Sequence, residues 1–434
     1  MRIGDFAIDD TVRSQVNTLI LGSIGFGKSS FLEECMRQDL ADEQPHCFIG
    51  LHSQSYHNMV RYLADNNYVD RRIILIDPSE GEWGKGINPF RQIPGIQQSV
   101  QVGGMVEAVM SVMGDNPNTH TVIFRLLTVI FTAMLEYDLT LDAAFELFAN
   151  RTAFSRKVET LCEPTVKALW SSLSKIPPSS WETQVAPTTT RLFRIIRSDT
   201  IRRFMCVNHK GYNLELTFKD YIYINLGTSG NLDSDAQRVS AALALNHFYQ
   251  RAKLRRGKEG EPPPPYYLYV DEWWLVPSPD FHRILAETRK FGLLLVLANQ
   301  DLAQIRDCFS AGFAESLLTL CQLQICFGGI NNNDASRLAR EWGLPVEQFK
   351  NIVPRQFLAK PPRGQAGVYT MPEVSQSYLA EQVIKTFERK IARKRGALLL
   401  EDVDRLRARL QSEGTIDEGR RGEALKKTGG FELE

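Results

Sequence analysis

The sequence lacks several features that would indicate a membrane, secreted or strongly nucleic-acid-binding protein. No apolar run approaches the roughly 18 residues of a membrane-spanning helix, and residues 126–135 have only the length of a core helix. The N-terminal MRIGDFAIDD has no signal-peptide core. Lysine plus arginine and aspartate plus glutamate both number 51. We therefore expect a soluble, cytoplasmic protein that contacts any polyanion only through local basic patches.

Cysteine is also missing in the spacings that make metal sites. The seven cysteines are scattered, with no C-x-x-C pair, and the closest two, Cys321 and Cys326, have no histidine near them in sequence. We therefore expect buried thiols in a reducing compartment and no zinc site. The length of 434 residues indicates one large α/β domain with an insert, or two domains.

A glycine-rich loop near the N-terminus is the strongest motif that is present. LGSIGFGKSS, at residues 21–30, fits G-x-x-x-x-G-K-[ST], with an apolar strand pattern before it and an amphipathic helix pattern after it. Such a loop turns backbone N–H groups toward a phosphate, while its lysine reaches the β- and γ-phosphates and its serine binds Mg²⁺. A chance glycine-rich turn is the alternative, and both flanks argue against it. We predict ATP and Mg²⁺ as ligands, bound by Gly22, Ser23, Gly25, Phe26, Gly27, Lys28, Ser29 and Ser30.

Polar residues close two later strand patterns. One apolar run ends in Asp271 and Glu272. In P-loop enzymes the first such acid completes the Mg²⁺ shell and the second polarises the attacking water, so we predict Ser29 and Asp271 as metal ligands and Glu272 as catalytic. The next run closes on Gln300, where an amide can sense the γ-phosphate, although a hydrogen-bonded amide at a strand end is the alternative.

The order of patterns along the chain indicates an α/β core interrupted by helices. Between residues 92 and 190 only helical apolar spacing occurs. We expect strands at residues 16–21, 46–51, 71–79, 213–218, 221–227, 266–272, 293–300 and 320–329. The predicted division is a first part of the core at 1–91, an all-helical insert at 92–190, a second part of the core at 191–375, and a charged helical extension with a flexible tail at 376–434.

Taken in order, these motifs resemble the HerA/FtsK superfamily of hexameric DNA-pumping ATPases, and within it the TraG/TraD-like coupling ATPases of conjugation and type IV secretion. The resemblance covers roughly residues 12–375. Its most specific pieces are RKFG, which leads to Gln300, and DASRLA after the last strand. It implies an α/β fold in which a RecA-like P-loop NTPase core, with a central, mostly parallel sheet, carries an all-α inserted domain.

The resemblance also implies a ring of identical subunits with active sites between neighbours. Arg289 matches an arginine that points into the neighbouring subunit's nucleotide site in coupling proteins, so it would be catalytic in trans. A helix-end cation paired with Glu287 or with the helix dipole is the alternative. Arg191, Arg194 and Arg197 are lesser candidates for the same role.

Coupling proteins usually begin with transmembrane helices, and this sequence shows none. We therefore expect an anchor or substrate selector in the insert, in the tail or in a membrane-anchored partner that recruits the protein to the inner membrane. The insert resembles the all-α domain implicated in substrate selection, although a packing cap is an equal alternative. The basic stretches RRGKEG, at 255–260, and IRRF, at 201–204, lack interleaved aromatics and add little to the case for DNA.

The main hypothesis is an ATP-driven DNA translocase that works as a hexameric ring and holds DNA in a central pore without reading its sequence. The first alternative is an ATPase that powers protein export or assembles a secretion channel. The second is an ATP-binding scaffold subunit of a defence or adaptor complex with little turnover. Intact Lys28, Asp271, Glu272 and Gln300 argue against the scaffold.

Overall fold

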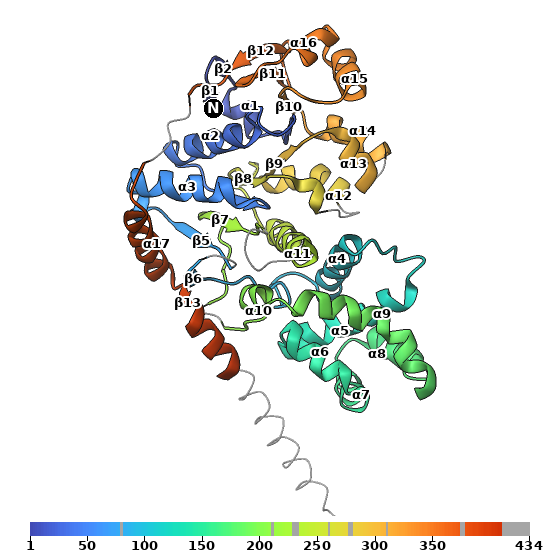
Figure 1. Cartoon of the computed structure of the whole chain (residues 1–434). Coiled ribbons are helices and arrows are strands. Elements are labelled where there is room, and N and C mark those ends of the chain that lie inside the picture. The colour runs from blue at the N-terminus through green and yellow to red at the C-terminus, as the bar shows by residue number, and fades with distance from the viewer. Residues whose placement is uncertain are drawn as a thin grey trace, which may run out of the picture.

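A computed structural model describes residues 1–78, 81–209, 212–227, 234–258, 261–276, 281–309, 311–373 and 378–409. Figure 1 shows helices on both faces of a central sheet, and a separate group of helices, α5 to α9, below it. The mixed α/β fold with a large, mainly parallel sheet confirms the predicted fold class.

The sheet has nine strands in the order β12-β11-β10-β3-β9-β8-β4-β7-β5. Every pair from β10 to β5 is parallel, whereas β11 and β12 are antiparallel to their neighbours. The strands are β3 (Thr18–Leu21), β4 (His46–Gly50), β5 (Ile73–Ile76), β7 (Tyr221–Asn225), β8 (Tyr266–Val270), β9 (Leu293–Asn299), β10 (Leu323–Cys326), β11 (Gln356–Lys360) and β12 (Gly367–Thr370).

Both faces of the central strands are buried, which explains their continuous apolar sequences. Alternate residues enter two separate cores: Ile20 joins the core under α2 (Lys28–Ala41) and α3 (Ser53–Asp65), and Leu21 joins the core on the side of α11 (Ser234–Ala252). The remaining helices of this part are α1 (Asp10–Arg13), α12 (Phe281–Glu287), α13 (Leu302–Cys308), α14 (Ala311–Leu320), α15 (Asn332–Trp342) and α16 (Val346–Lys350).

Between β6 and β7, the described residues form a run of seven helices. They are α4 (Gln98–Val112), α5 (Thr121–Tyr137), α6 (Leu141–Ala149), α7 (Arg151–Glu159), α8 (Pro164–Leu173), α9 (Pro178–Ile196) and α10 (Asp199–Met205). Helix α4 packs against α11, and α5 packs against α4 and α9, so the group rests on the sheet through α4 and α11. Helix α9 continues past residue 190, where the sequence analysis divides the insert from the core. None of the helices in the part of the chain that the structure describes could span a bilayer.

The strand predicted at residues 213–218 is wrong. Only Asn213 forms a bridge, with Gly86, and Phe218 has a φ of +57°, which ends the extended conformation. Leu214 and Leu216 are buried against the core, so their alternation with polar residues reflects packing of a loop rather than a strand. The sheet ends instead at β5.

Three short antiparallel ribbons in the described part of the chain were not predicted. They are the pair β1 (Arg2–Ile3) and β2 (Phe6–Ala7), the hairpin of β11 and β12, and the pair β6 (Trp83–Gly84) and β13 (Leu398–Leu399). The last pair joins segments more than 300 residues apart, which local sequence patterns do not reveal.

The C-terminal extension contacts both the sheet and the helical group. Helix α17 (Glu381–Arg395) packs on β5 and α3, and Arg395 donates to the carbonyl of Arg71 (2.7 Å). Residues 400–409 form a further helix, in which Asp404 pairs with Arg203 of α10 (2.6 Å) and Arg407 pairs with Asp142 of α6 (2.8 Å). The predicted flexible tail lies outside the described residues.

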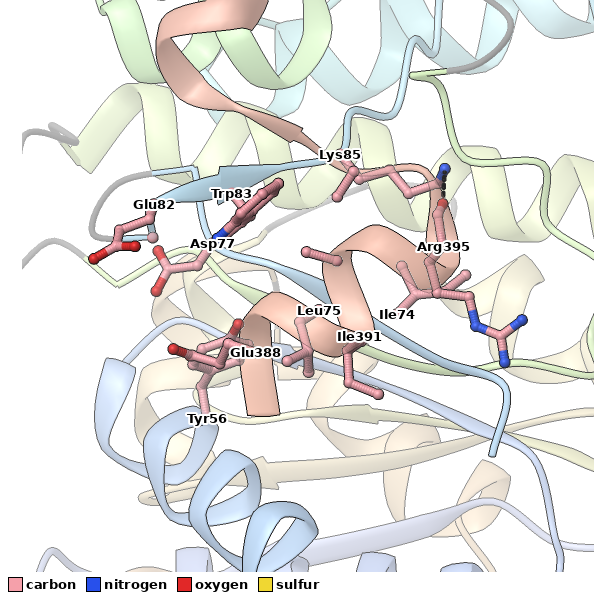
Figure 2. A pocket seen from close by; sticks show the side chains of 13 residues that line it. Tyr56, Ile74, Leu75, Asp77, Glu82, Trp83, Lys85, Glu388, Ile391 and Arg395 are labelled. Atoms are coloured by element: carbon pink, nitrogen blue, oxygen red, sulfur yellow. Dashed lines mark hydrogen bonds between the residues drawn. The ribbon is translucent and has the colours of Figure 1, made fainter. Parts of the chain in front are cut away.

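A small cavity of about 40 Å³ lies between α17, β5 and β6 (Figure 2). Asp77, Glu82 and Glu388 line it. Burial and, to a smaller extent, the negative charges of Asp77 and Glu82 raise the pKa of Glu388 to about 7, although Lys385 opposes this shift. At neutral pH the docked α17 therefore holds a carboxyl group that resists ionisation.

We expect Glu388→Gln to stabilise the protein at alkaline pH. The ordinary pKa of 4.5 applies in the unfolded chain, so the free energy of unfolding of the wild type falls as pH rises from 4.5 to about 7 and then stays low. The glutamine variant escapes this loss, and its advantage should grow from pH 5 to about 1–2 kcal/mol at pH 8, after allowance for solvent screening. Thermal or urea unfolding at both pH values measures it. The exposed Glu401→Gln is the control, and an advantage independent of pH would contradict the assignment.

Candidate active site

Three neighbouring parallel strands bring the predicted site residues to one edge of the sheet. Strand β9 lies between β3 and β8, and all three run in the same direction. The glycine-rich loop follows β3, Asp271 and Glu272 follow β8, and Gln300 follows β9. The carboxyl ends of parallel strands are where open α/β sheets bind ligands.

The glycine-rich loop is shaped and anchored by its neighbours. Gly22 has a φ of +147° and Gly27 one of +115°, a region that favours glycine. A Cβ at Gly22 would lie 2.5 Å from the Cβ of Phe327, so no side chain fits there. The loop is tied to both flanking strands, because Gly22 N donates to the carbonyl of Gln300 (3.0 Å) and Ser23 N to that of Gly328 (2.9 Å).

Helix α2 begins at Lys28, directly after the loop, so its free N–H groups and dipole favour an anion there. Lys28 is 5% exposed, and its Nζ lies 4.0 Å from Oε1 of Glu272. Burial lowers the pKa of Lys28, while Glu272 and Asp271 act against this shift. Ser29 and Ser30 occupy the first turn of the same helix. The arrangement offers a cation, helix amides and a hydroxyl to a phosphate.

Ser29 and Asp271 form a pair suited to a magnesium ion. Ser29 Oγ donates to Oδ2 of Asp271 (3.2 Å). The other oxygen, Oδ1, is buried and has no hydrogen-bond partner among the residues that the structure describes. Burial and, to a smaller extent, the negative charge of Glu272 raise the pKa of Asp271 to about 6, although Lys28 opposes this shift. A buried carboxylate with an unused oxygen beside a hydroxyl matches the oxygen ligands that Mg²⁺ prefers.

Glu272 and Gln300 also lie together. Gln300 Nε2 is 3.5 Å from Oε1 of Glu272, and Trp274 Nε1 donates to Oε2 (2.8 Å). Glu272 has a φ of +52°, an unusual conformation for a residue other than glycine. Backbone strain of this kind concentrates at functional sites. Trp274 was not among the predicted site residues, although it lies only two positions after Glu272.

Arg289 does not join this group. It is exposed in the short 3₁₀ turn Thr288–Phe291, before β9, and therefore lies at the opposite edge of the sheet from Gln300. The seven residues of β9 span roughly 20 Å, too far for Arg289 to reach the loop of its own chain. Glu287 pairs with Lys290 (3.8 Å).

The lesser arginine candidates have partners within the chain. Arg191 binds Asp115 through two nitrogens, with Nη2 2.6 Å from Oδ1, and Arg194 pairs with Asp235. These contacts hold α9 against neighbouring segments.

We expect Asp271→Asn to weaken Mg²⁺-dependent nucleotide binding at least about tenfold, because a charged metal ligand becomes neutral. The same change should stabilise the metal-free protein at pH 8. The wild type must bury a carboxylate whose pKa of about 6 exceeds the ordinary 3.8, so its free energy of unfolding falls as pH rises through this range. Titration with a fluorescent ATP analogue, with and without Mg²⁺, and thermal unfolding measure the two effects. Asp402→Asn in the C-terminal helix is the control; equal binding by wild type and Asp271→Asn would contradict the metal role.

Comparisons with known proteins relate this region to conjugative coupling proteins. Residues 265–344 match the family model described as the TraM recognition site of TraD and TraG, a stretch that includes Asp271, Glu272, Arg289 and Gln300. No curated protein sequence matches the chain.

Several solved structures are similar in fold. The unbound bacterial conjugative coupling protein TrwBdeltaN70 has a TM-score of 0.61 at 11% identity, over 85% of this chain and 87% of that one. TrwB in complex with ADP and Mg²⁺ has a TM-score of 0.58 at 12% identity, over 85% and 88%. VirB4 of Thermoanaerobacter pseudethanolicus has a TM-score of 0.53 at 16% identity, over 85% and 90%. The family-model match confirms the resemblance to TraG and TraD in the sequence of residues 265–344, and the solved structures confirm the expected fold.

Proposed function

We propose that the protein is an ATP-hydrolysing DNA translocase that acts as a hexameric ring, in conjugative or type IV-like DNA transfer or a related DNA-processing system. The convergence of the glycine loop, Asp271, Glu272 and Gln300 at one sheet edge carries the proposal. Similarity in fold to a conjugative coupling protein, TrwB, whose structures include complexes with ADP, Mg²⁺ and an ATP analogue, supports it.

Each side chain has a distinct part in the proposed reaction. Lys28 and the amides of the loop bind phosphate oxygens, and Ser29 and Asp271 hold Mg²⁺. The metal ion supplies Lewis-acid stabilisation of charge on those oxygens. Glu272 accepts a proton from the attacking water, and the Gln300 amide, close to Oε1 of Glu272, orients that water.

A ring would complete this site. Arg289 is exposed at the far edge of the sheet, where a neighbour's nucleotide would be within reach in a head-to-tail ring. We assign Arg289 as the arginine that neutralises the γ-phosphate of the adjacent subunit's ATP.

DNA would be held by phosphate contacts in the central pore, without sequence preference. The basic stretch at 201–204 does not contribute to this proposal, because Arg202 pairs with Asp199 and Arg203 with Asp404. Part of the loop 255–260 lies outside the described residues. We further propose a cytoplasmic location and a membrane-anchored or substrate-selecting partner that recruits the ring to the inner membrane.

The similarity to VirB4 supports a second candidate, an ATPase that powers protein export or assembles a secretion channel. It shares the same site and differs in what the ring moves. Stimulation of ATP hydrolysis by DNA distinguishes the two candidates, because only a DNA motor couples turnover to the polymer.

We expect Glu272→Gln to lower kcat for ATP at least about 100-fold while nucleotide binding persists, because the variant keeps the shape of the side chain but loses the base. Steady-state ATPase assays, with and without single- and double-stranded DNA, measure both turnover and stimulation. The same change at Glu341, exposed on α15, serves as the control. A wild type as inactive as Glu272→Gln would favour the scaffold, and a wild type that ignores DNA would favour the export ATPase.

We expect Arg289→Ala to lower the rate of ATP hydrolysis about 1,000-fold. Mixing this variant with Glu272→Gln subunits should restore part of the activity. In a mixed ring, an Arg289→Ala subunit keeps its own Glu272 and receives Arg289 from a Glu272→Gln neighbour, so some junctions become complete. The ATPase rate of the mixture against each single variant measures this. Lys290→Ala, the adjacent cation, should retain activity. A mixture no more active than its parts would contradict an action in trans.

A further inference from the structure

Asp334 is a buried, heavily hydrogen-bonded acid near the site that the reaction does not use. It lies in the first turn of α15 and is 1% exposed. Its Oδ2 accepts from Leu302 N (2.8 Å) and from Asn331 Nδ2 (2.7 Å), and its Oδ1 accepts from Arg306 Nη2 (2.8 Å). Its own N–H donates to Asn331 Oδ1 (2.9 Å).

These contacts join the two loops that flank the glycine loop. Leu302 begins α13, two residues after Gln300, and Arg306 is one turn further along that helix. Asn331 caps α15 and follows Gly328 and Gly329, whose carbonyls bind Ser23. One buried carboxylate therefore fixes the end of β9 against the end of β10, on either side of the phosphate-binding loop.

The turn that carries Gln300 also has hydrogen bonds of its own. Asn299, fully buried, donates to the carbonyl of Asp301 (2.6 Å), and Asp301 caps α13 by accepting from Gln304 N (2.9 Å). Gln300 itself is only partly buried, and its amide lies at the long distance of 3.5 Å from Glu272. Its direction therefore depends on the backbone that Asp334 anchors.

We infer that Asp334 is a positioning residue, which acts through Gln300 by fixing the turn between β9 and α13. The inference rests on the proposed function, because Gln300 matters only where ATP is hydrolysed. Loss of the Asp334 contacts lets the Gln300 amide move away from Glu272, and a misplacement of about 1 Å is enough to cost up to about 100-fold in rate.

A double-mutant cycle in kcat tests the inference on the full chain under conditions of maximal ATPase activity. We expect Asp334→Asn to lower kcat about 10- to 100-fold in the wild-type background and less than about twofold in the Gln300→Ala background. The KM for ATP should stay within about twofold, since Lys28 and the loop amides are intact. The midpoint of thermal unfolding should shift by the same amount in both backgrounds, because the contribution of Asp334 to stability does not depend on the Gln300 side chain.

Two further variants keep the test decisive. Arg306→Gln removes one hydrogen-bond partner of Asp334 and, because the Arg306 side chain is 28% exposed, disturbs the core less than a change at Asp334. If Asp334→Asn does not fold, this variant should show a smaller loss of kcat with the same dependence on Gln300. Arg337→Ala, on the same helix and paired with Glu341, should leave kcat unchanged. Equal losses of kcat in both Gln300 backgrounds would overturn the inference alone. Full kcat in Gln300→Ala would overturn it together with the sensor role in the proposed function.

Discussion

The shared register of β3, β9 and β8 is the constraint on which the site depends. Leu21 lies opposite Asn299, and Val270 lies opposite Leu297, so the residues that follow the three strands emerge side by side. A slip of one residue would reverse which face every side chain meets, and would separate Gln300 from Glu272. The two buried cores on either face of the sheet oppose such a slip, because it would move apolar side chains such as Ile20 into the wrong core.

The residues that follow a strong local pattern were predictable from sequence. The apolar runs that became β3, β8 and β9 are buried on both faces, and the glycine loop carries its pattern within ten residues. Asp271 and Glu272 could be proposed because parallel strands deliver their final residues to a common edge. The structure places Ser29 and Asp271, Lys28 and Glu272, and Gln300 and Glu272 in pairs, and their chemical roles stay predictions.

Long-range packing accounts for what the sequence did not reveal. The alternating pattern at residues 213–218 resembles a strand, yet Phe218 turns the chain before it can pair. Phe327 could not be assigned to the glycine loop from a distance of some 300 residues, although its Cβ is what excludes a side chain at Gly22. Asp334 stood out only within the DASRLA stretch, and its link to α13 depends on a fold that brings two loops together.

The C-terminal extension links the sheet to the helical group through contacts with both. Helix α17 packs on β5 at the edge of the sheet, and β13 pairs with β6. Asp404 and Arg407 form ion pairs with α10 and α6 of the helical group. A hinge rotation of the helical group against the sheet would have to break these contacts. The extension thus bridges the sheet and the helical group, and its contacts oppose a rotation of one against the other.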